Sequence, residues 1–391
     1  MYWLELAGDD DAFAAFEAQS GATGVEVLAP GLATATAVVP DRVRGLAYTR
    51  RVNELVGRTD ADLRSAQVLL ETAPLERPGT VAVRATDVRG TTGVDTARAE
   101  RVLGQVLVNR GYSVDLDDPD HTLRVAFSRG RIPAAASADR PGIVTAHEPE
   151  SGLQGTVAES TDDGGERSQR TDSGTVGGDQ SVCVLGWLVT ASVRDFGDRR
   201  PTDSPFFQPG GMDPLLARAV ANLAGARPGR TILDPMCGTA GLLAEAGLLG
   251  ATVVGSDVQA KMVSGASTNL SYHLSASDDN SNLATPGPWN VIRADATSLP
   301  LADDAVDAVV FDAPYGRQSK IEGHDLADLV AGALSEARRV ADRAVVVADR
   351  SWARHAREAG WELLASFDRR VHRSLTRQVL VVEKSSSDDR L

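Results

Sequence analysis

Short apolar runs and amphipathic helices alternate along the C-terminal half of the chain, from about residue 213 onward. The first helix has Asp213 in a capping position and Pro214 at its first helical position. Such alternation predicts an α/β fold with a mainly parallel, doubly wound sheet. The last two strands have no helix between them, so we expect them to pair antiparallel. The predicted strands are TILDP, TVVGSD, NVIRAD, DAVVFDAP, RAVVVAD, WELLASFDRRVH and TRQVLVVEK.

The N-terminal half has a different pattern, which predicts an α+β region. Residues 1 to about 60 are expected to form a strand, a helix and a strand, the last being GVEVLAPGLATATAVV. Further on we expect strands at TVAVRATDV, TLRVAFS and VCVLGWLVTASV, with a helix from Asp95 to Asn109 after the first of them. Residues 151–180 are rich in Gly, Ser, Thr and Asp, and we expect a disordered insertion there. The expected segments are 1–65, 66–195 and 196–391.

Composition excludes several classes of protein. The longest apolar runs have the length of strands, so we expect no membrane span. The opening MYWLELAGDDDAF has acids where a secretory signal has basic and apolar residues, and we expect a cytoplasmic protein. Cys183 and Cys237 lack CxxC spacing, so we predict neither a disulfide framework nor a metal site.

The charge balance is unusual. The formal net charge is −14, and Lys occurs only at positions 261, 320 and 384, so Arg carries nearly all the positive charge. An acid-rich surface stays hydrated in concentrated salt, and we therefore expect a halophilic archaeal source. Such a surface also masks the basic signal of a nucleic-acid-binding protein, so net charge does not identify the partner.

An aspartate follows each of the first four predicted strands of the C-terminal half. These are Asp234, Asp257, Asp295 and Asp312. Ligands of open α/β sheets bind beyond the carboxyl ends of the strands. Helix capping alone does not explain four such acids in succession, and we expect them to form one site.

The loop after the first of these strands, LDPMCGTAG, indicates which ligand the acids bind. It lacks GxGxxG and places an acid before the glycines, where a pyrophosphate would be repelled, so a dehydrogenase is excluded. S-adenosylmethionine, which has no phosphate, fits better. Asp257 can bind its ribose hydroxyls, Asp295 its adenine amino group, and Asp234 lies where a carboxylate would attract its cationic sulfonium and amino groups.

The stretch VVFDAPYGR, residues 309–317, has the residues that methylation of an amino group requires. An exocyclic amine on a base is a weak nucleophile because its lone pair is delocalised into the ring. Asp312 and the carbonyl of Ala313 can accept its two N–H hydrogens, and Pro314 stiffens their arrangement. Tyr315 offers a face on which a planar base can stack.

These motifs resemble a known family. TILDPMCGTAG, GSDV, RADA and DAPYGR are similar to the motifs of class I amino-methyltransferases, and the C-terminal part, including VHRSLTRQVLVV, resembles the archaeal tRNA guanosine-10 N2-methyltransferases. The resemblance implies a Rossmann-like methyltransferase domain at 196–391. It also implies a ferredoxin-like segment and a tRNA-binding THUMP domain before it. Ala240 and Ala313 depart from the family, which usually has Gly and Pro there.

The resemblance implies transfer of a methyl group from S-adenosylmethionine to the N2 amino group of a tRNA guanosine, expected to be G10. The alternatives are methylation of rRNA guanine, DNA adenine or protein glutamine, or an inactive RNA-binding protein. We expect a monomer and leave open the small zinc-binding activator of eukaryotic relatives. The predicted catalytic residues are Asp312, Ala313, Pro314 and Tyr315. The predicted cofactor-binding residues are Asp234, Cys237, Gly238, Ala240, Gly241, Asp257, Asp295 and Ala296.

Overall fold

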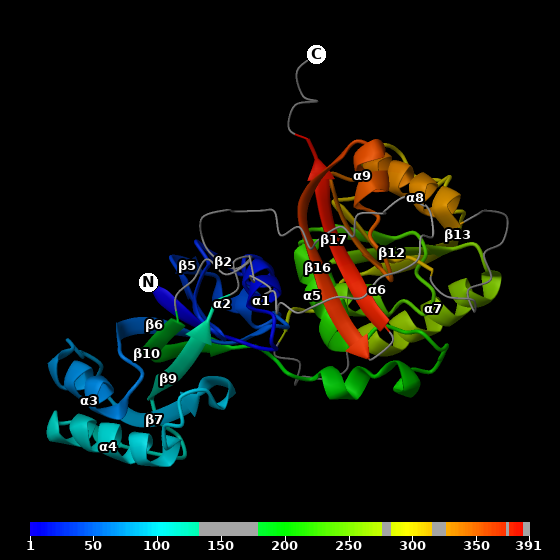
Figure 1. The fold of residues 1–391 in the computed structure, drawn as a ribbon. Helices are drawn as coiled ribbons and strands as arrows, with labels where there is room; N and C mark the ends of the chain where they lie inside the picture. The colour runs from blue at the N-terminus through cyan, green and yellow to red at the C-terminus, as the bar shows by residue number, and fades with distance from the viewer. Residues whose placement is uncertain (133–178, 276–282, 315–325, 373–374, 386–391) are drawn as a thin grey trace, which may run out of the picture.

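The computed structural model describes residues 1–132, 179–275, 283–314, 326–372 and 375–385. Within them the chain forms an N-terminal lobe (residues 1–191) and a C-terminal lobe (from Pro214 onward), joined by a linker (residues 192–213). Figure 1 shows the two lobes side by side, each built around its own sheet. No helix of the described part of the chain is long and apolar enough to span a membrane.

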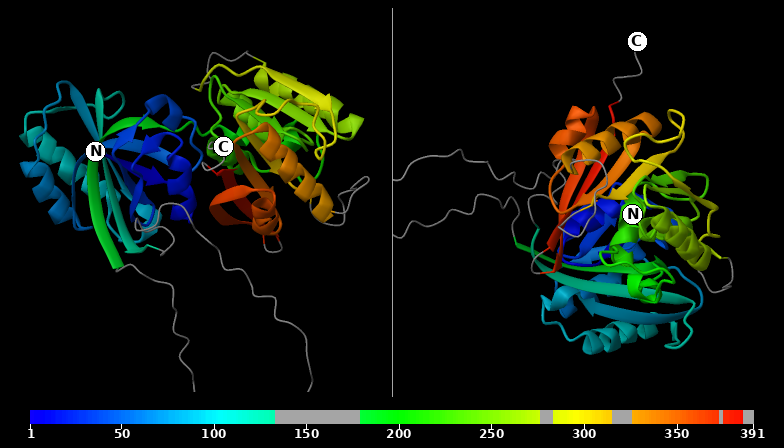
Figure 2. Two further views of the ribbon diagram at one scale, coloured as in Figure 1. Left: turned by 90° about the horizontal axis from the view of Figure 1, so that it is seen from above. Right: turned by 90° about the vertical axis from the view of Figure 1, so that its right-hand side faces the viewer.

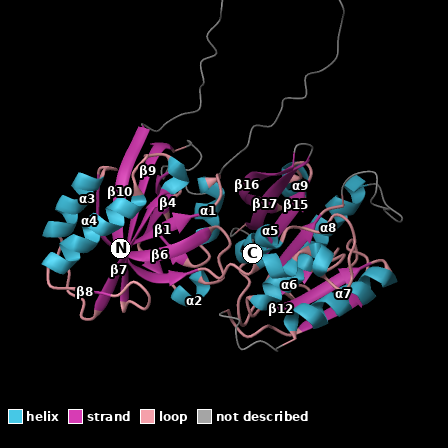
Figure 3. Ribbon diagram, turned by 90° about the horizontal axis from the view of Figure 1, so that it is seen from below, coloured by secondary structure: helices cyan, strands magenta, loops and turns pink. Residues whose placement is uncertain are grey.

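The described N-terminal lobe is built on an eight-stranded mixed sheet in the order β3-β4-β1-β6-β10-β9-β7-β8. Both expected N-terminal segments, 1–65 and 66–195, contribute strands to it. Figure 3 shows α3 and α4 along one side of this lobe, where their apolar residues pack on the sheet. The sheet's strands are β1 (Tyr2–Leu6), β3 (Glu26–Ala29), β4 (Leu32–Ala35), β6 (Thr49–Thr59), β7 (Thr80–Asp87), β8 (Ser113–Val114), β9 (His121–Arg131) and β10 (Asp179–Ala191), and β2 (Ala22–Thr23) and β5 (Ala37–Val38) form a separate two-stranded sheet. Its helices are α1 (Asp11–Ala18), α2 (Pro40–Val43), α3 (Leu63–Thr72) and α4 (Thr96–Asn109), with a short 3-10 turn at Val88–Gly90.

The structure has a hairpin where the sequence predicts one of the strands of this lobe. The run GVEVLAPGLATATAVV is not one strand, because β3 and β4 form a hairpin across Pro30 and Gly31, where Gly31 has a φ of 73°. Proline cannot continue a strand ladder and glycine adopts positive φ readily, so the pair makes a turn. The expected disordered insertion, 151–180, lies outside the described residues except for its last two, Asp179 and Gln180, which already pair with β9.

The C-terminal lobe is the doubly wound α/β domain that the sequence predicts. Its seven described strands lie in the order β13-β12-β11-β14-β15-β17-β16, and all run parallel except β17, which is antiparallel to both of its neighbours, β15 and β16. Asp213 caps α5 by accepting from the N–H of Leu215, as expected. The strands are β11 (Thr231–Asp234), β12 (Thr252–Asp257), β13 (Trp289–Arg293), β14 (Ala308–Asp312), β15 (Arg343–Ala348), β16 (Trp361–His372) and β17 (Leu375–Lys384). The helices are α5 (Pro214–Leu223), α6 (Gly241–Leu248), α7 (Ala260–Leu274), α8 (Leu326–Val340) and α9 (Ala353–Glu358).

Helices cover both faces of this sheet because its strands are apolar on both sides. Along β14, Ala308 and Val310 belong to the core beneath α5, α6 and α7, whereas Val309 and Phe311 belong to the core beneath α8 and α9. A continuous apolar strand of this kind is typical of a parallel sheet buried on both faces.

The two lobes share a core. Residues of α1 and α2 pack with α5, α6 and β16 in one hydrophobic cluster, and the rings of Phe13 and Phe367 meet edge to face at 5.2 Å. Figure 2 shows the blue N-terminal helices beside the C-terminal lobe from two further directions. The lobes are therefore packed together and not merely tethered.

A buried carboxylate lies at this junction. Glu17 of α1 is fully buried and accepts from the N–H groups of Ala47 and Tyr48, both at 2.6 Å, and from Nδ2 of Asn222 at 2.7 Å. Burial raises the pKa of Glu17, and these hydrogen bonds oppose the shift. Asn222 lies on α5, so its side chain links the two lobes directly.

Candidate active site at the carboxyl edge of the C-terminal sheet

The sheet order brings the four expected aspartates to one edge. Asp257, Asp234 and Asp312 are the last residues of the adjacent parallel strands β12, β11 and β14, and Asp295 follows the next strand, β13. Because parallel strands end at the same edge, the acids form a row in the order Asp295, Asp257, Asp234, Asp312. Alternation of strands and helices predicted a shared edge, and the strand order determines which acids are neighbours.

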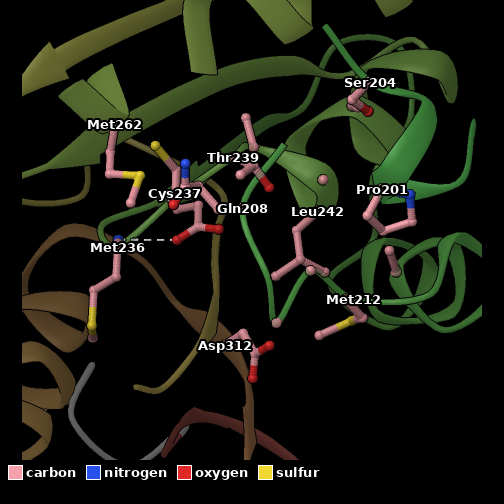
Figure 4. A pocket seen from close by; sticks show the side chains of 18 of the residues that line it. Pro201, Ser204, Gln208, Met212, Met236, Cys237, Thr239, Leu242, Met262 and Asp312 are labelled. Carbon is pink, nitrogen blue, oxygen red and sulfur yellow. Dashed lines mark hydrogen bonds between the residues drawn. The ribbon is translucent and has the colours of Figure 1, made fainter. Parts of the chain in front are cut away.

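Asp234 is the most deeply buried acid of this row. It is 2% exposed, and its Oδ1 accepts from the N–H of Met236 at 3.0 Å, the bond drawn as a dashed line in Figure 4. Burial raises the pKa of Asp234 well above its usual range, and the carboxylates of Asp257 and Asp312 raise it further. A cationic ligand would relieve this repulsion, so the acids favour a positively charged group.

The loop between β11 and α6 leaves room for a ligand against its backbone. Gly238 and Ala240 have φ values of 52° and 63°, in the left-handed region. A Cβ placed on Gly238 or Gly241 would meet no atom within 4 Å, so the space beside each glycine is open. Cys237 is buried, and its N–H donates to the carbonyl of Ser256, which ties the loop to β12.

Asp257 and Asp295 use part of their hydrogen-bonding capacity locally. Asp257 accepts from the N–H of Gly238 at 3.2 Å and from that of Gln259 at 2.9 Å, and Oδ1 of Asp295 accepts from the N–H and the hydroxyl of Thr297, both at 2.8 Å. The carboxylate of Asp257 therefore orders the glycine loop. Burial raises the pKa of Asp257, and these two N–H groups oppose the shift.

A cavity of about 570 Å³ lies beside the first strand-end loop. It is lined by Asp234, Cys237, Gly238, Ala240, Gly241, Asp312, Ala313 and Pro314 among the expected site residues, whereas Asp257, Asp295 and Ala296 do not line it. In Figure 4, Pro201, Ser204, Gln208 and Met212 of the linker and Met236, Cys237 and Thr239 of the loop surround the same hollow, with Asp312 at one side. The linker thus forms one wall of the cavity, a role that sequence analysis missed. Its Pro-Gly-Gly run was the available signal, since such residues mark a constrained turn.

Two side chains of α7, Asn269 and His273, contact the linker that forms this wall. Asn269 is 2% exposed, accepts from the N–H of Phe206 at 2.9 Å, and donates to the carbonyls of Phe206 and Thr239, also at 2.9 Å. Ser204 is within 3.0 Å of Nε2 of His273, one turn further along α7. Asn269 therefore joins the linker to the glycine loop, and residues of both line the cavity.

Asp312 differs from the other acids because its two oxygens have different surroundings. Oδ2 is 3.1 Å from Nη2 of Arg377, an arginine of β17 whose side chain is 4% exposed. Oδ1 is buried and has no hydrogen-bond partner among the described residues. Burial raises the pKa of Asp312 to about 7, with Arg377 lowering it and Asp349 raising it. An acid that titrates near neutral pH and has a free acceptor oxygen suits a proton acceptor.

The rest of the predicted catalytic motif is described only in part. Ala313 is buried and its N–H donates to the carbonyl of Val347 at 2.8 Å, which anchors the turn to β15. Pro314 lines the cavity, and Tyr315 lies outside the described residues. Arg377 was not among the predicted site residues. The available signal is an arginine at the polar start of an apolar strand, TRQVLVV.

A second hollow, of about 610 Å³, lies at the opposite edge of the same sheet. It is lined by residues that precede β11, β14 and β15, among them Arg230, Asp307 and Asp342. Parallel strands begin there, so this hollow is remote from the row of strand-end acids. In the described residues, no group of three or more His, Cys, Asp or Glu side chains is arranged to hold a metal ion.

Comparison with known proteins agrees with this site. Residues 201–379 match the RMKL-like methyltransferase domain family. The chain is 37% identical over 204 residues to the tRNA (guanine(10)-N2)-dimethyltransferase of Methanothermobacter thermautotrophicus, a match that covers 50% of this chain and 56% of that protein. It is 33% identical over 195 residues to the enzyme of the same name from Pyrococcus abyssi, covering 49% and 55%.

The matches thus span about half the length of these relatives. TrmN from Thermus thermophilus has a similar structure over 98% of this chain and 100% of its own, with 22% sequence identity and a TM-score of 0.44, which is too low to support a conclusion by itself. The matched residues hold the strand-end acids, the glycine loop and most of the linker. Residues 201–379 of this chain are therefore similar to the RMKL-like methyltransferase domain family.

Proposed function

We propose that this protein transfers methyl groups from S-adenosylmethionine to the exocyclic N2 amino group of a guanosine in tRNA, at position 10. The two archaeal relatives are tRNA guanine-N2 dimethyltransferases. The observation that carries the proposal is the buried Oδ1 of Asp312, which has no partner among the described residues and belongs to a residue that lines the cavity beside Asp234. A buried acceptor oxygen without a donor is costly, and the amino group of a substrate supplies one.

The cavity together with the strand-end acids beside it suits S-adenosylmethionine. Asp234 and its neighbouring acids favour the positive charge, and the open space beside Gly238 and Gly241 lets a ligand lie against the backbone. Asp257 would hold the ribose hydroxyls. Its carboxylate can accept their hydrogen bonds in addition to those it already accepts from Gly238 and Gln259. Asp295 and Ala296 would lie near the adenine. When bound, this cofactor supplies an electrophilic methyl group on a positively charged sulfur.

The chain itself orients the acceptor and takes its proton. Oδ1 of Asp312 and the carbonyl of Ala313 accept the two N–H hydrogens of guanine N2, which turns the nitrogen lone pair toward the methyl group. As N2 gains the methyl group it loses a proton, and the carboxylate of Asp312 receives it. Tyr315 would stack on the base, and Pro314 would stiffen the turn.

The N-terminal lobe would bind the tRNA. We propose that its segments 1–65 and 66–195 correspond to a ferredoxin-like segment and a THUMP domain, ahead of the methyltransferase domain at 196–391. The shared core of the lobes would hold a bound tRNA at a constant position relative to Asp312. A second round of transfer to the same nitrogen would give dimethylguanosine.

Two variants separate the proposed chemistry from cofactor binding. Asp312→Ala should lower turnover by at least ~10²-fold, the loss typical of a missing general base, and leave S-adenosylmethionine affinity within a factor of a few. Asp257→Ala should weaken cofactor binding by about 1.5–3 kcal/mol, as expected for lost hydrogen bonds to a charged group. Calorimetry measures the affinity. Transfer of labelled methyl to unmodified tRNA, followed by nucleoside analysis, measures activity and product.

Several outcomes would contradict the proposal. If Asp312→Ala turned over like the parent, the carboxylate would have no part in the chemistry. If label appeared on adenine or on protein, the acceptor would be wrong. If calorimetry showed unchanged affinity for Asp257→Ala, Asp257 would not belong to the cofactor site.

A further inference from the structure

Arg377 reaches the catalytic edge from a strand that is not next to β14. The sheet order is β14-β15-β17, so β15 lies between them. Ala348, the last residue of β15, pairs with Gln378. Arg377 therefore stands just beyond the end of β15, and its side chain passes over that end to Oδ2 of Asp312, at 3.1 Å. Arginine is suited to this position because its long, planar guanidinium keeps its charge when buried.

The same guanidinium contacts the linker. Nη2 of Arg377 donates to the carbonyl of Gly210 at 3.2 Å, and Gly210 lines the cavity. One buried side chain thus contacts both the proposed proton acceptor and the linker wall of the cavity. Its position is set by the antiparallel β17, and so it is independent of β14, the strand that carries Asp312.

We propose that Arg377 is the positioning residue of the methyl-transfer step: it holds Oδ2 of Asp312, leaves Oδ1 for the amino group of the acceptor, and ties this arrangement to the linker through Gly210. The proposal rests on the proposed function, because it assigns the free oxygen of Asp312 to the substrate. Nothing in the resemblance or the comparisons assigns this role to Arg377. An arginine that had no electrostatic contact with Asp312 would be replaceable without any change in how activity depends on pH.

The groups around Asp312 determine the sign of the expected pH effect. Arg377 on β17 favours the carboxylate, whereas Asp349 after β15 and Asp234 at the end of β11 oppose it. With the pKa of Asp312 at about 7, activity should fall as the pH drops below neutrality. Removing the positive charge raises that pKa, and removing the charge of Asp349 lowers it.

The experiment compares the acidic limb of the pH profile of kcat/KM in three variants. In Arg377→Gln the limb should move up by about one pH unit, which corresponds to an about tenfold loss of activity on that limb. Arg377→Lys keeps the charge but loses the planar guanidinium group, so the acidic limb of its pH profile should lie between those of the parent and Arg377→Gln. In Asp349→Asn the limb should move down, opposite in sign to Arg377→Gln. Methyl transfer to unmodified tRNA is the assay throughout.

Arg343→Gln is the matched control, since Arg343 is a partly buried arginine of the same sheet that pairs with Glu383 at the other end of β15. It should leave the profile unchanged. Thermal unfolding and calorimetric S-adenosylmethionine affinity show whether each variant is folded. If Arg377→Gln does not fold, the positions of the Arg377→Lys and Asp349→Asn limbs decide the question.

A parent-like limb in folded Arg377→Gln, or limbs of Arg377→Lys and Asp349→Asn that do not differ from the parent, would overturn the inference. Asp312→Ala, assayed in parallel, separates this result from a failure of the proposed function. If Asp312→Ala is inactive while the limbs do not move, only the role of Arg377 is wrong. If Asp312→Ala is active, the proposed function itself fails.

Discussion

Ala240 occupies a backbone conformation that alanine seldom adopts. Its φ and ψ are 63° and 27°, in the left-handed region, and the residue precedes α6 in the loop that lines the cavity. Such a conformation costs a residue with a Cβ roughly 1–2 kcal/mol. Glycine has no Cβ and would adopt this conformation without that strain.

Ala240→Gly should therefore stabilise the protein by up to about 1 kcal/mol. The released strain exceeds the extra conformational entropy that glycine gives the unfolded chain, roughly 0.4–1 kcal/mol. Chemical denaturation measures the change in the free energy of unfolding. Ala244→Gly, a buried helical position in α6, is the control and should destabilise by at least ~0.5 kcal/mol. Destabilisation by both substitutions would mean that Ala240 is not strained.

At the scale of secondary-structure elements, α7 packs against the linker and holds it in place. Phe206 of the linker packs on Gly265 so closely that a Cβ there would lie 2.0 Å from its ring, and Asn269 binds both backbone groups of Phe206. Glycine at position 265 is thus required by the approach of the linker, and the linker in turn closes the cavity. The position of this wall therefore depends on α7, a helix that follows the linker by more than 40 residues in the sequence.

Asn269→Leu should destabilise the protein by about 1–3 kcal/mol, because it leaves polar backbone groups of Phe206 and Thr239 without their partner. It should also weaken S-adenosylmethionine binding by about tenfold through the loosened wall. Thermal unfolding and calorimetry measure the two effects. Ser267→Ala on the same helix, whose hydroxyl donates to the carbonyl of Val263, is the control. If Asn269→Leu bound cofactor like the parent, the linker wall would have no part in binding.

At the scale of the whole molecule, the two lobes share one hydrophobic core, and we expect them to unfold together. α1 and α2 pack with α5, α6 and β16, and Glu17 and Asn222 close the junction with buried hydrogen bonds. A tRNA bound to the N-terminal lobe would therefore approach the methyltransferase domain in a defined orientation. Separate domains on a flexible linker would not have this property.

Asn222→Ala should lower the midpoint of a single unfolding transition, with a loss of about 1–3 kcal/mol, because buried Glu17 loses a donor. Calorimetry would show one shifted transition, and near-ultraviolet circular dichroism should report the same midpoint. Gln19→Ala, an adjacent surface position at the end of α1, is the control and should have little effect. Two separate transitions in Asn222→Ala would instead show that the lobes unfold independently.

The sequence by itself determined the architecture of the C-terminal lobe. Strands and helices are set by local periodicity, and a βαβ pattern places all parallel strand ends at one edge, so Asp234, Asp257 and Asp312 had to share it. Asp213 and Pro214 likewise determined where α5 begins. The prediction of a single strand at residues 24–39 was wrong, because a Pro-Gly pair inside an apolar run makes a turn.

Only the tertiary structure decided which side chains meet at the site. Arg377 reaches Asp312 because β17 runs antiparallel beside β15, and Asn269 reaches the linker because α7 packs against it. Such contacts join segments far apart in the chain, and no local period encodes them. The different surroundings of the two Asp312 oxygens have the same origin. The two oxygens of a carboxylate are chemically equivalent, and nothing in the sequence distinguishes them. Only the packed neighbours pair one oxygen with Arg377 and leave the other for a substrate.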